Sequence, residues 1–124
     1  PLLKMKRDIL DHLRERGLAY EEESNLNAVL PLVNVVYQTR VQKERFDHAS
    51  DYEKCRGLYV IDRASLDLMQ RDAILMHPLP RIDEITMEVD QDPRAAYFRQ
   101  AQNGLYVRMA LLKMVLGPGS CAST

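Results

Sequence analysis

Two short apolar runs, each followed by a polar stretch, constrain this fold most. Val33–Tyr37 is rich in β-branched residues, and Ala73–Met76 is apolar throughout. Runs of this length without polar alternation are typical of parallel strands buried on both faces. Parallel strands need a crossover of about a dozen residues or more, usually a helix. The interval between the two runs is long enough for such a crossover, so the sequence predicts a βαβ arrangement.

Helices are predicted on both sides of these strands. A helical face of apolar residues spans 4–16 and stops at Gly17, and Ser24, Asp51 and Asp62 are candidate N-caps of three further helices. Asp92-Pro93 predicts the start of a C-terminal helical segment with a break or bend at Asn103-Gly104. That segment carries an apolar stripe of Leu105, Met109, Leu112 and Leu116. Two shorter strands are predicted at 18–20 and 58–61.

The alternation of strands and helices predicts the α/β class. We expect a three-layer α/β/α, Rossmann-like domain with a mostly parallel sheet. With 124 residues the chain has the size of one domain, which we place at 1–117, followed by a small, polar, flexible tail at 118–124. A helical pattern begins almost at Pro1, which indicates a cut within a longer protein.

Composition excludes several function classes. The chain has 17 basic and 18 acidic residues, for a net charge of −1, which argues against a nucleic-acid partner. No apolar run approaches the roughly 18 residues of a membrane span, so no membrane partner is expected. The two cysteines, Cys55 and Cys121, are far apart and outside any metal-binding spacing, which favours free thiols and no metal site.

The segment after the first strand, 38–46, concentrates cations at Arg40, Lys43 and Arg45. Such a run is often only a solvated face. Its place at the carboxyl end of a parallel strand, where ligands bind, favours a binding role instead. Arg40 can present a planar fork to a carboxylate, Gln42 adds a neutral donor and acceptor, and Glu44 is spaced to orient Arg40. These residue types indicate recognition of a small anion.

The segment after the second strand, His77-Pro78-Leu79-Pro80-Arg81, predicts a stiff turn. Pro78 and Pro80 have no amide donors, and the turn can hold carbonyls that accept hydrogen bonds from an NH₂ group. A purely structural turn without a ligand remains the alternative. His77 is predicted to be a structural histidine rather than a base.

Three segments together resemble the catalytic chains of aspartate carbamoyltransferases. They are Val35–Phe46, Met76–Ile85 and Asp92–Ala101 with the following Asn103-Gly104-Leu105, and the likeness runs from about Pro1 to Gly117. Ornithine carbamoyltransferases carry Cys in place of Pro78 and a Ser-Met-Gly stretch in place of the Thr39-Arg40 region. The resemblance is therefore to the aspartate enzymes.

The resemblance implies a role for each matching residue. Arg40 and Gln42 would contact L-aspartate, Glu44 would support Arg40, and Arg45 would make interdomain contacts. Pro78, Leu79 and Pro80 would line the carbamoyl phosphate site, with a cis peptide bond before Pro80. The family's catalytic His and its Ser-Thr-Arg-Thr phosphate loop have no counterpart in these residues, so no catalytic residue is expected in this chain.

The implied reaction moves the carbamoyl group of carbamoyl phosphate onto the amine of L-aspartate in de novo pyrimidine synthesis, without a metal or cofactor. The implied partners are the family's N-terminal domain and a homotrimer, in the cytoplasm, or in a plastid if the source is a plant or alga. The chain alone is expected to be inactive and its sheet to lack the first strand. A non-catalytic interaction module of the same fold and another carbamoyltransferase are the alternatives.

Overall fold

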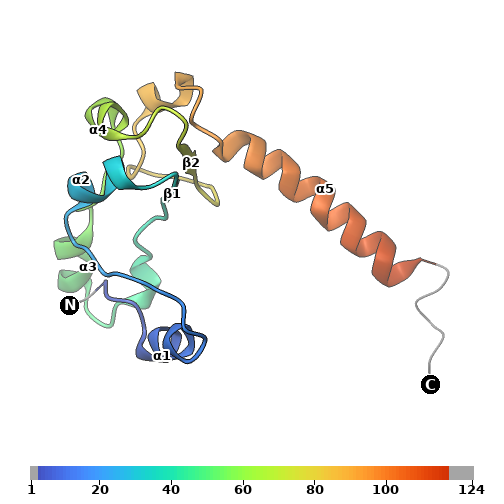
Figure 1. Cartoon of the computed structure of the whole chain (residues 1–124), viewed down its shortest axis with the longest axis horizontal. Coiled ribbons are helices and arrows are strands. Elements are labelled where there is room, and N and C mark those ends of the chain that lie inside the picture. Colours follow the sequence, from blue (N-terminus) through green and yellow to red (C-terminus); the bar gives the residue numbers. More distant parts are fainter. Residues whose placement is uncertain (1–2, 118–124) are drawn as a thin grey trace.

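The computed structural model describes residues 3–117, so the predicted tail at 118–124 and Cys121 lie outside the described residues. Most of the chain forms a body around two short strands, from which one long helix extends (Figure 1). The α-helices are α1 (Arg7–Glu15), α2 (Leu26–Val29), α3 (Ala49–Cys55), α4 (Arg63–Leu68) and α5 (Tyr97–Leu116). The strands are β1 (Val35–Tyr37) and β2 (Ile74–Met76), and the short 3-10 helices are η1 (Leu30–Leu32), η2 (Lys43–Arg45) and η3 (Met87–Gln91).

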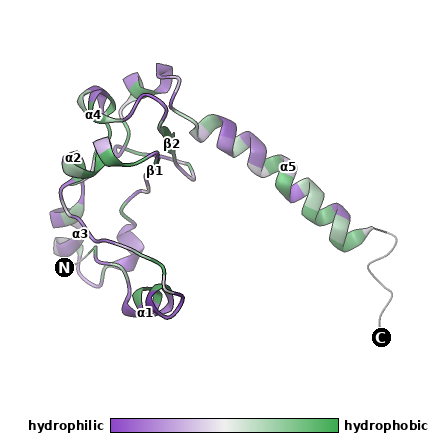
Figure 2. Ribbon diagram, in the orientation of Figure 1, coloured by the Kyte–Doolittle hydropathy of each residue, from purple (hydrophilic) through white to green (hydrophobic). Residues whose placement is uncertain are grey.

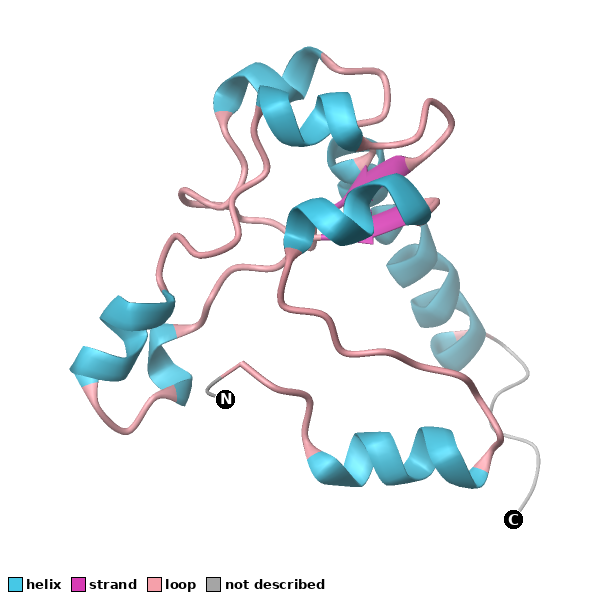
Figure 3. Cartoon of the chain, turned by 60° about the vertical axis from the view of Figure 1, so that its left-hand side comes forward, coloured by secondary structure: helices cyan, strands magenta, loops and turns pink. Residues whose placement is uncertain are grey.

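The two predicted apolar runs form the sheet. β1 and β2 are parallel neighbours, with Val35 opposite Ile74 and Tyr37 opposite Met76. The crossover between them contains α3 and α4, as parallel pairing requires. Helices lie around the strand pair in Figure 3. The predicted α/β class with a parallel sheet is confirmed, and both strands end at the segments singled out in the sequence.

The hydrophobic core lies beside β2. Leu75, at the centre of β2, is fully buried, and so is Tyr97 at the start of α5, which belongs to the same cluster. Helix α4 packs against η1 and η3. The buried members of this cluster are Leu30, Ile61, Leu66, Met69, Ala73, Leu75, Ile85, Val89 and Tyr97. The core thereby fixes the position of the chain on both sides of the turn at residues 77–81.

Burial of β1 on both faces was predicted and is wrong. Val35 and Tyr37 are 50% and 52% exposed. Within residues 3–117, β1 is an edge strand with β2 as its sheet neighbour. The predicted strand at 18–20 is irregular, and of 58–61 only Ile61 forms a single parallel bridge, to Ile85. A strand exists only where a partner strand supplies its hydrogen bonds, so propensity alone overestimates the sheet.

The predicted caps were right at one helix and wrong at two. Asp62 accepts a hydrogen bond from the Ser65 amide at 2.8 Å and caps α4 as expected. Asn25, rather than Ser24, caps α2 through the Ala28 amide. Helix α3 begins at Ala49, so Asp51 lies in its first turn and pairs with Lys54 instead of capping it. The N-cap is the residue just before the first helical turn, and Asn25 and His48 hold that position in α2 and α3.

The long C-terminal helix differs from the sequence prediction at both marked positions. Asp92-Pro93 does not start it, because Asp92 accepts from the Arg94 amide in a turn and α5 begins at Tyr97. Asn103-Gly104 does not break it either, and α5 is continuous through these residues (Figure 1). A glycine in a helix interior costs only about 1 kcal/mol relative to alanine, which good helix formers on both sides offset.

The apolar stripe of α5 is exposed within the described part of the chain. Leu105, Met109, Leu112 and Leu116 are between 55% and 77% exposed. Apolar residues recur along the helix as it leaves the body (Figure 2). Helix α1 likewise buries none of its residues. An amphipathic helix with an uncovered apolar face lacks the packing that normally stabilises it.

The Asp92–Arg94 pair predicts a loss of stability in acid. Hydrogen bonds from the Arg94 side chain and amide lower the pKa of Asp92 to about 2. The folded pKa lies below the unfolded one, so this stability is present above about pH 4 and lost as the pH falls towards about 2, amounting to at most about 2 kcal/mol. Denaturant unfolding at several pH values should show a smaller acid loss for Asp92→Asn than for the unaltered chain. Asp11→Asn, at the exposed surface pair with Arg14, is the control; an equal acid loss in all three proteins would contradict the assignment.

Candidate anion-binding cleft

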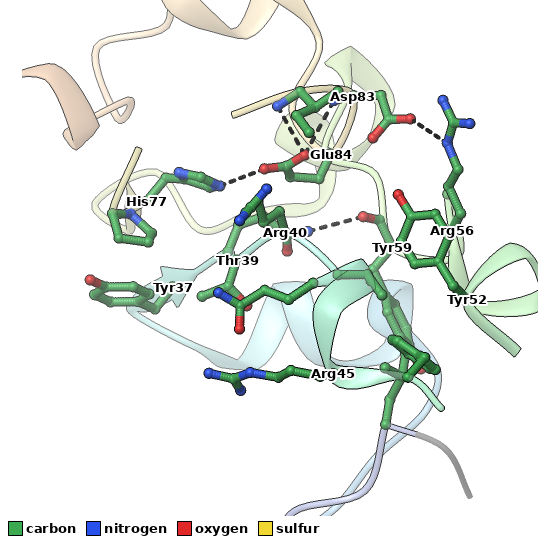
Figure 4. A pocket seen from close by; sticks show the side chains of 18 of the residues that line it. Tyr37, Thr39, Arg40, Arg45, Tyr52, Arg56, Tyr59, His77, Asp83 and Glu84 are labelled. Carbon is green, nitrogen blue, oxygen red and sulfur yellow. Dashed lines mark hydrogen bonds and ion pairs between the residues drawn. The ribbon is translucent and has the colours of Figure 1, made fainter. Parts of the chain in front are cut away.

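The segments after β1 and β2 line one open cleft of roughly 1110 Å³. Arg40, Gln42 and Arg45 come from the first segment, and the turn Pro78–Pro80 from the second. Figure 4 shows Arg40 and His77 on neighbouring sides of this cleft, with Tyr59 and Arg56 farther along it. The cleft lies at the carboxyl ends of two parallel strands, as expected for a ligand site in an α/β sheet.

Gln38 holds the first segment in place. Its backbone N–H donates to the Met76 carbonyl at 2.9 Å, which extends the pairing of the strands by one residue. Its side chain is buried and donates to the Tyr59 carbonyl at 3.0 Å. A buried amide with satisfied hydrogen bonds fixes the backbone that carries it. Gln38 therefore determines where Thr39 and Arg40 enter the cleft, a role that sequence reasoning missed.

Arg40 makes the ion pair with Glu44 that the spacing predicted, with 3.0 Å between guanidinium nitrogen and carboxylate oxygen. The intervening chain is not an α-helix, since only Lys43–Arg45 forms a 3-10 turn. Arg40 is 39% exposed and has a single ion-pair partner among residues 3–117. A guanidinium has five N–H donors in a planar fork, so donors remain for a ligand carboxylate.

Arg45 and Gln42 also line the cleft. Arg45 extends along the cleft in Figure 4 and forms no ion pair with any other described residue. Together with Arg40 it makes this side of the cleft electropositive, although the chain as a whole is close to neutral. The positive charge predicted at the end of β1, on Arg40 and Arg45, therefore lines the cleft.

The turn after β2 has an unusual backbone. The Leu79–Pro80 peptide bond is cis, as the resemblance implied, and Leu79 has a φ of 48°. A left-handed conformation is uncommon for a bulky residue and costs roughly 1–2 kcal/mol. Leu79 packs against the hydrophobic core on one side and lines the cleft on the other. The turn is thus held by its surroundings in one conformation at the edge of the cleft.

A buried histidine and a buried glutamate hold this turn through hydrogen bonds. His77 Nδ1 accepts from the Leu79 amide at 2.8 Å, and His77 Nε2 lies 2.8 Å from Glu84 Oε1. Glu84 Oε2 accepts from the amides of Ile82 and Asp83. His77 is 1% and Glu84 6% exposed. His77 is structural, as predicted, whereas no sequence signal identified Glu84 as its partner.

Gln100 connects the two sides of the cleft. Its carbonyl accepts from the His77 amide at 3.0 Å, and its NH₂ group donates to the Tyr37 hydroxyl at 3.0 Å. One side chain from the first turns of α5 thus bridges the end of β1 and the end of β2. Tyr37 and Gln100 are 63 positions apart in sequence, and no local pattern indicated this bridge.

Arg81, Asp90 and Tyr97 anchor the chain just after the turn. Arg81 bonds both oxygens of the Asp90 carboxylate, and the Tyr97 hydroxyl contacts both side chains. The hydrogen bonds from Arg81 lower the pKa of Asp90, whereas burial and the bond to Asp90 raise the pKa of Tyr97 to about 12. Asp90 is therefore ionised and Tyr97 protonated at neutral pH, and the triad fixes the exit of the turn.

These features define an α/β domain with a cleft built to take a small anionic ligand. The guanidinium of Arg40 and the side-chain amide of Gln42 follow β1, and the rigid turn Pro78–Pro80 follows β2. Within residues 3–117 no group of three or more His, Cys, Asp and Glu side chains could hold a metal ion. No helix in the same range is long and apolar enough to cross a membrane.

The family model described as "Aspartate/ornithine carbamoyltransferase, Asp/Orn binding domain" matches residues 3–115. The chain therefore belongs to the aspartate/ornithine carbamoyltransferase family and carries its Asp/Orn-binding domain. The predicted resemblance to the C-terminal part of aspartate carbamoyltransferase catalytic chains is confirmed by this match and by the relatives below.

Among curated proteins, the chain is similar to chloroplastic aspartate carbamoyltransferases of plants. It is 56% identical to the Oryza sativa protein over 93% of its own length and 32% of the relative's. It is 58% identical to the Arabidopsis thaliana protein, again over 93% of its own length and 30% of the relative's. The chain thus spans about a third of the length of these relatives.

Solved structures agree in fold. The catalytic subunit of M. jannaschii aspartate transcarbamoylase matches with a TM-score of 0.79 and 41% identity, over 91% of this chain and 37% of that one. Aspartate transcarbamoylase from Trypanosoma cruzi in complex with aspartate and phosphate matches with a TM-score of 0.79 and 37% identity, over 90% of this chain and 38% of that one. The Rossmann-like α/β fold expected from the sequence is thereby supported.

Proposed function

We propose that this chain is the aspartate-binding part of an aspartate carbamoyltransferase, an enzyme that forms N-carbamoyl-L-aspartate and phosphate in pyrimidine synthesis. The observation that carries the proposal is the placement of Arg40 and the Pro78–Pro80 turn on the same cleft. A transferase for an anionic amino acid and carbamoyl phosphate needs a carboxylate clamp beside a site for the carbamoyl group. The T. cruzi relative, whose structure is a complex with aspartate and phosphate, supports these substrates.

In this proposal Arg40 and Gln42 bind L-aspartate. The Arg40 guanidinium takes a carboxylate through paired N–H donors, while Glu44 limits the orientations of the arginine. Gln42 adds a neutral donor and acceptor from the same side of the cleft. Arg45, which has no ion-pair partner in the described chain, contacts the second domain when the two domains close.

Pro78, Leu79 and Pro80 form one wall of the carbamoyl phosphate site. Because Pro78 and Pro80 lack amide hydrogens, the backbone of this turn presents mainly carbonyl oxygens, which suit the NH₂ group of a carbamoyl compound. The α-amine of aspartate attacks the carbonyl carbon of carbamoyl phosphate, and phosphate leaves from the tetrahedral intermediate. Holding the two substrates in reacting orientation is this chain's contribution to the rate. The proposed reaction involves no cofactor and no covalent enzyme intermediate.

The remaining machinery belongs to other parts of the assembly. We place the aspartate-binding domain at 1–117 and a tail at 118–124, and propose that a carbamoyl-phosphate-binding domain and a homotrimer complete the active site. The exposed apolar stripe of α5 and the open cleft support a need for further protein. For the compartment we propose the cytoplasm or a plastid, and the chloroplastic plant relatives support the plastid.

A hybrid enzyme tests the function. This chain replaces the matching part of the M. jannaschii catalytic subunit, of which it covers 37%. We expect the hybrid to form carbamoyl-aspartate from carbamoyl phosphate and L-aspartate, to leave ornithine unreacted, and the chain alone to be inactive. The M. jannaschii remainder without this chain is the control.

Each outcome separates the alternatives. A folded hybrid that makes no product with aspartate would favour the non-catalytic module. Product with ornithine would indicate another carbamoyltransferase. Turnover by the isolated chain would refute the dependence on a second domain.

A further inference from the structure

The imidazole of His77 has both nitrogens engaged inside the protein. The Leu79 amide can only donate, so His77 Nδ1, 2.8 Å away, accepts and carries no proton. The proton is therefore on Nε2, which donates to the carboxylate of Glu84 at 2.8 Å. The ring is 1% exposed. A histidine with no free nitrogen and no open face cannot take a proton from a substrate, although it lies next to the cleft.

Both carboxylate oxygens of Glu84 also accept hydrogen bonds inside the protein. Its second carboxylate oxygen accepts from the amides of Ile82 at 3.1 Å and Asp83 at 3.2 Å. One buried carboxylate thus joins the start of the loop, through His77, to the amides near its end. The loop from 77 to 84 is closed by this pair, with the proline turn between the two ends.

Leu79 is the part of the turn that needs this support. Because Pro78 and Pro80 have no N–H, Leu79 supplies the only amide hydrogen in the turn. That hydrogen goes to His77 Nδ1, and the same residue has the left-handed φ of 48°. A non-glycine residue keeps such a conformation only where the surrounding structure enforces it.

From this geometry we propose that His77 and Glu84 act as a positioning pair that sets the backbone of Pro78–Leu79–Pro80. Glu84 fixes the tautomer and the orientation of the ring, and the ring fixes the Leu79 amide and hence the direction of the neighbouring carbonyls. The proposal rests on the proposed function, since it takes this turn as one wall of the substrate site. His77 is a positioning residue and not a catalytic base.

Two substitutions of His77 separate positioning from general packing. In His77→Asn the side-chain oxygen reaches the position of Nδ1 and still accepts from the Leu79 amide, but contact with Glu84 is lost. In His77→Gln the longer side chain reaches towards Glu84 and leaves the Leu79 amide without its acceptor. Both variants remove the ring, and their side chains differ by a single methylene group.

Amide hydrogen exchange in the hybrid enzyme measures the protection of the turn's backbone and does not require an active enzyme. We expect the Leu79 amide to exchange roughly tenfold faster or more in His77→Gln, because a lost hydrogen bond is worth about a factor of this size, and to keep most of its protection in His77→Asn. The amides of Leu66 and Leu75, in the buried core, report whether the whole domain opens instead. Equal exchange of the Leu79 amide in both variants would overturn the proposal.

Kinetics of the same hybrids provide the second readout. We expect kcat to fall about tenfold in His77→Gln and no more than about threefold in His77→Asn. The aspartate KM should change little in both, because the proposed aspartate clamp belongs to the segment after β1 and not to this turn. Rates that follow only the melting temperature would mean a merely structural role and would reject the pair as a positioning device.

Two further results keep this test separate from that of the function. If the unaltered hybrid makes no carbamoyl-aspartate, the proposed function fails, while exchange at Leu79 still tests the pair. If His77→Gln does not fold, Glu84→Gln replaces it. That variant keeps the volume but has one acceptor oxygen in place of two, so it cannot accept both from His77 Nε2 and from the amides of Ile82 and Asp83. Faster exchange at Leu79 is expected, and unchanged exchange would overturn the proposal.

Discussion

Replacing Arg40 with alanine in the hybrid enzyme is expected to lower kcat/KM for aspartate about 100-fold, because truncating one partner of a desolvated charge pair costs several kcal/mol. Arg40 lines the cleft and has donors beyond those used by Glu44. Arg40→Lys should recover only part of the activity, since an ammonium keeps the charge but not the planar fork. Steady-state kinetics with varied aspartate at saturating carbamoyl phosphate measure the effect.

Two variants control for the loss of charge. Arg71→Ala removes the same side chain from an exposed turn before β2 and should leave the aspartate response unchanged. Glu44→Gln weakens the exposed pair with Arg40 and should raise the aspartate KM only several-fold, because such surface pairs contribute little. An unaltered aspartate KM in Arg40→Ala would remove Arg40 from the proposed clamp.

Replacing Arg81 with methionine is expected to destabilise the chain by about 3 kcal/mol, because breaking a largely buried ion pair leaves an uncompensated charge. The side chains of Arg81 and Asp90 are 16% and 20% exposed, and the buried Tyr97 hydroxyl depends on both. The free energy of unfolding from urea titration at neutral pH measures the change. The double variant Arg81→Met, Asp90→Leu should regain part of the loss, since no buried carboxylate is then left unpaired.

The surface pair Arg63–Asp67 is the matched control for this experiment. Its side chains are 70% and 67% exposed, so Arg63→Ala should change the free energy of unfolding by less than about 1 kcal/mol. If Arg81→Met costs no more than Arg63→Ala, the triad does not anchor the turn. The same comparison in the hybrid would then show whether the turn needs that anchor for activity.

Local sequence patterns located the parts of the candidate site. Two apolar runs identified β1 and β2, and the residues after each run proved to line one cleft. The Arg40–Glu44 pair followed from spacing alone, and so did the Asp62 cap of α4. These features depend on residues at most a few positions apart, and short-range geometry is what a sequence reveals directly.

Other features could not be read from the sequence. The start of α5 at Tyr97 rather than at Asp92-Pro93 depends on Tyr97 filling the core beside Leu75. The exposure of β1 depends on what packs over the face that carries Val35 and Tyr37. Propensity and caps allow several boundaries for an element, and packing chooses one of them.

The sequence by itself determined the α/β class, the family resemblance and the segments that carry the chemistry, because each is encoded in contiguous residues. Only the tertiary structure decided how those segments are held. Gln100 joins Tyr37 to the amide of His77, and Arg81 reaches Asp90 and Tyr97, contacts made between separate elements. Such hydrogen bonds form between groups that the fold brings together. Buried polar groups must find partners wherever the chain places them, and no local pattern records which partner that is.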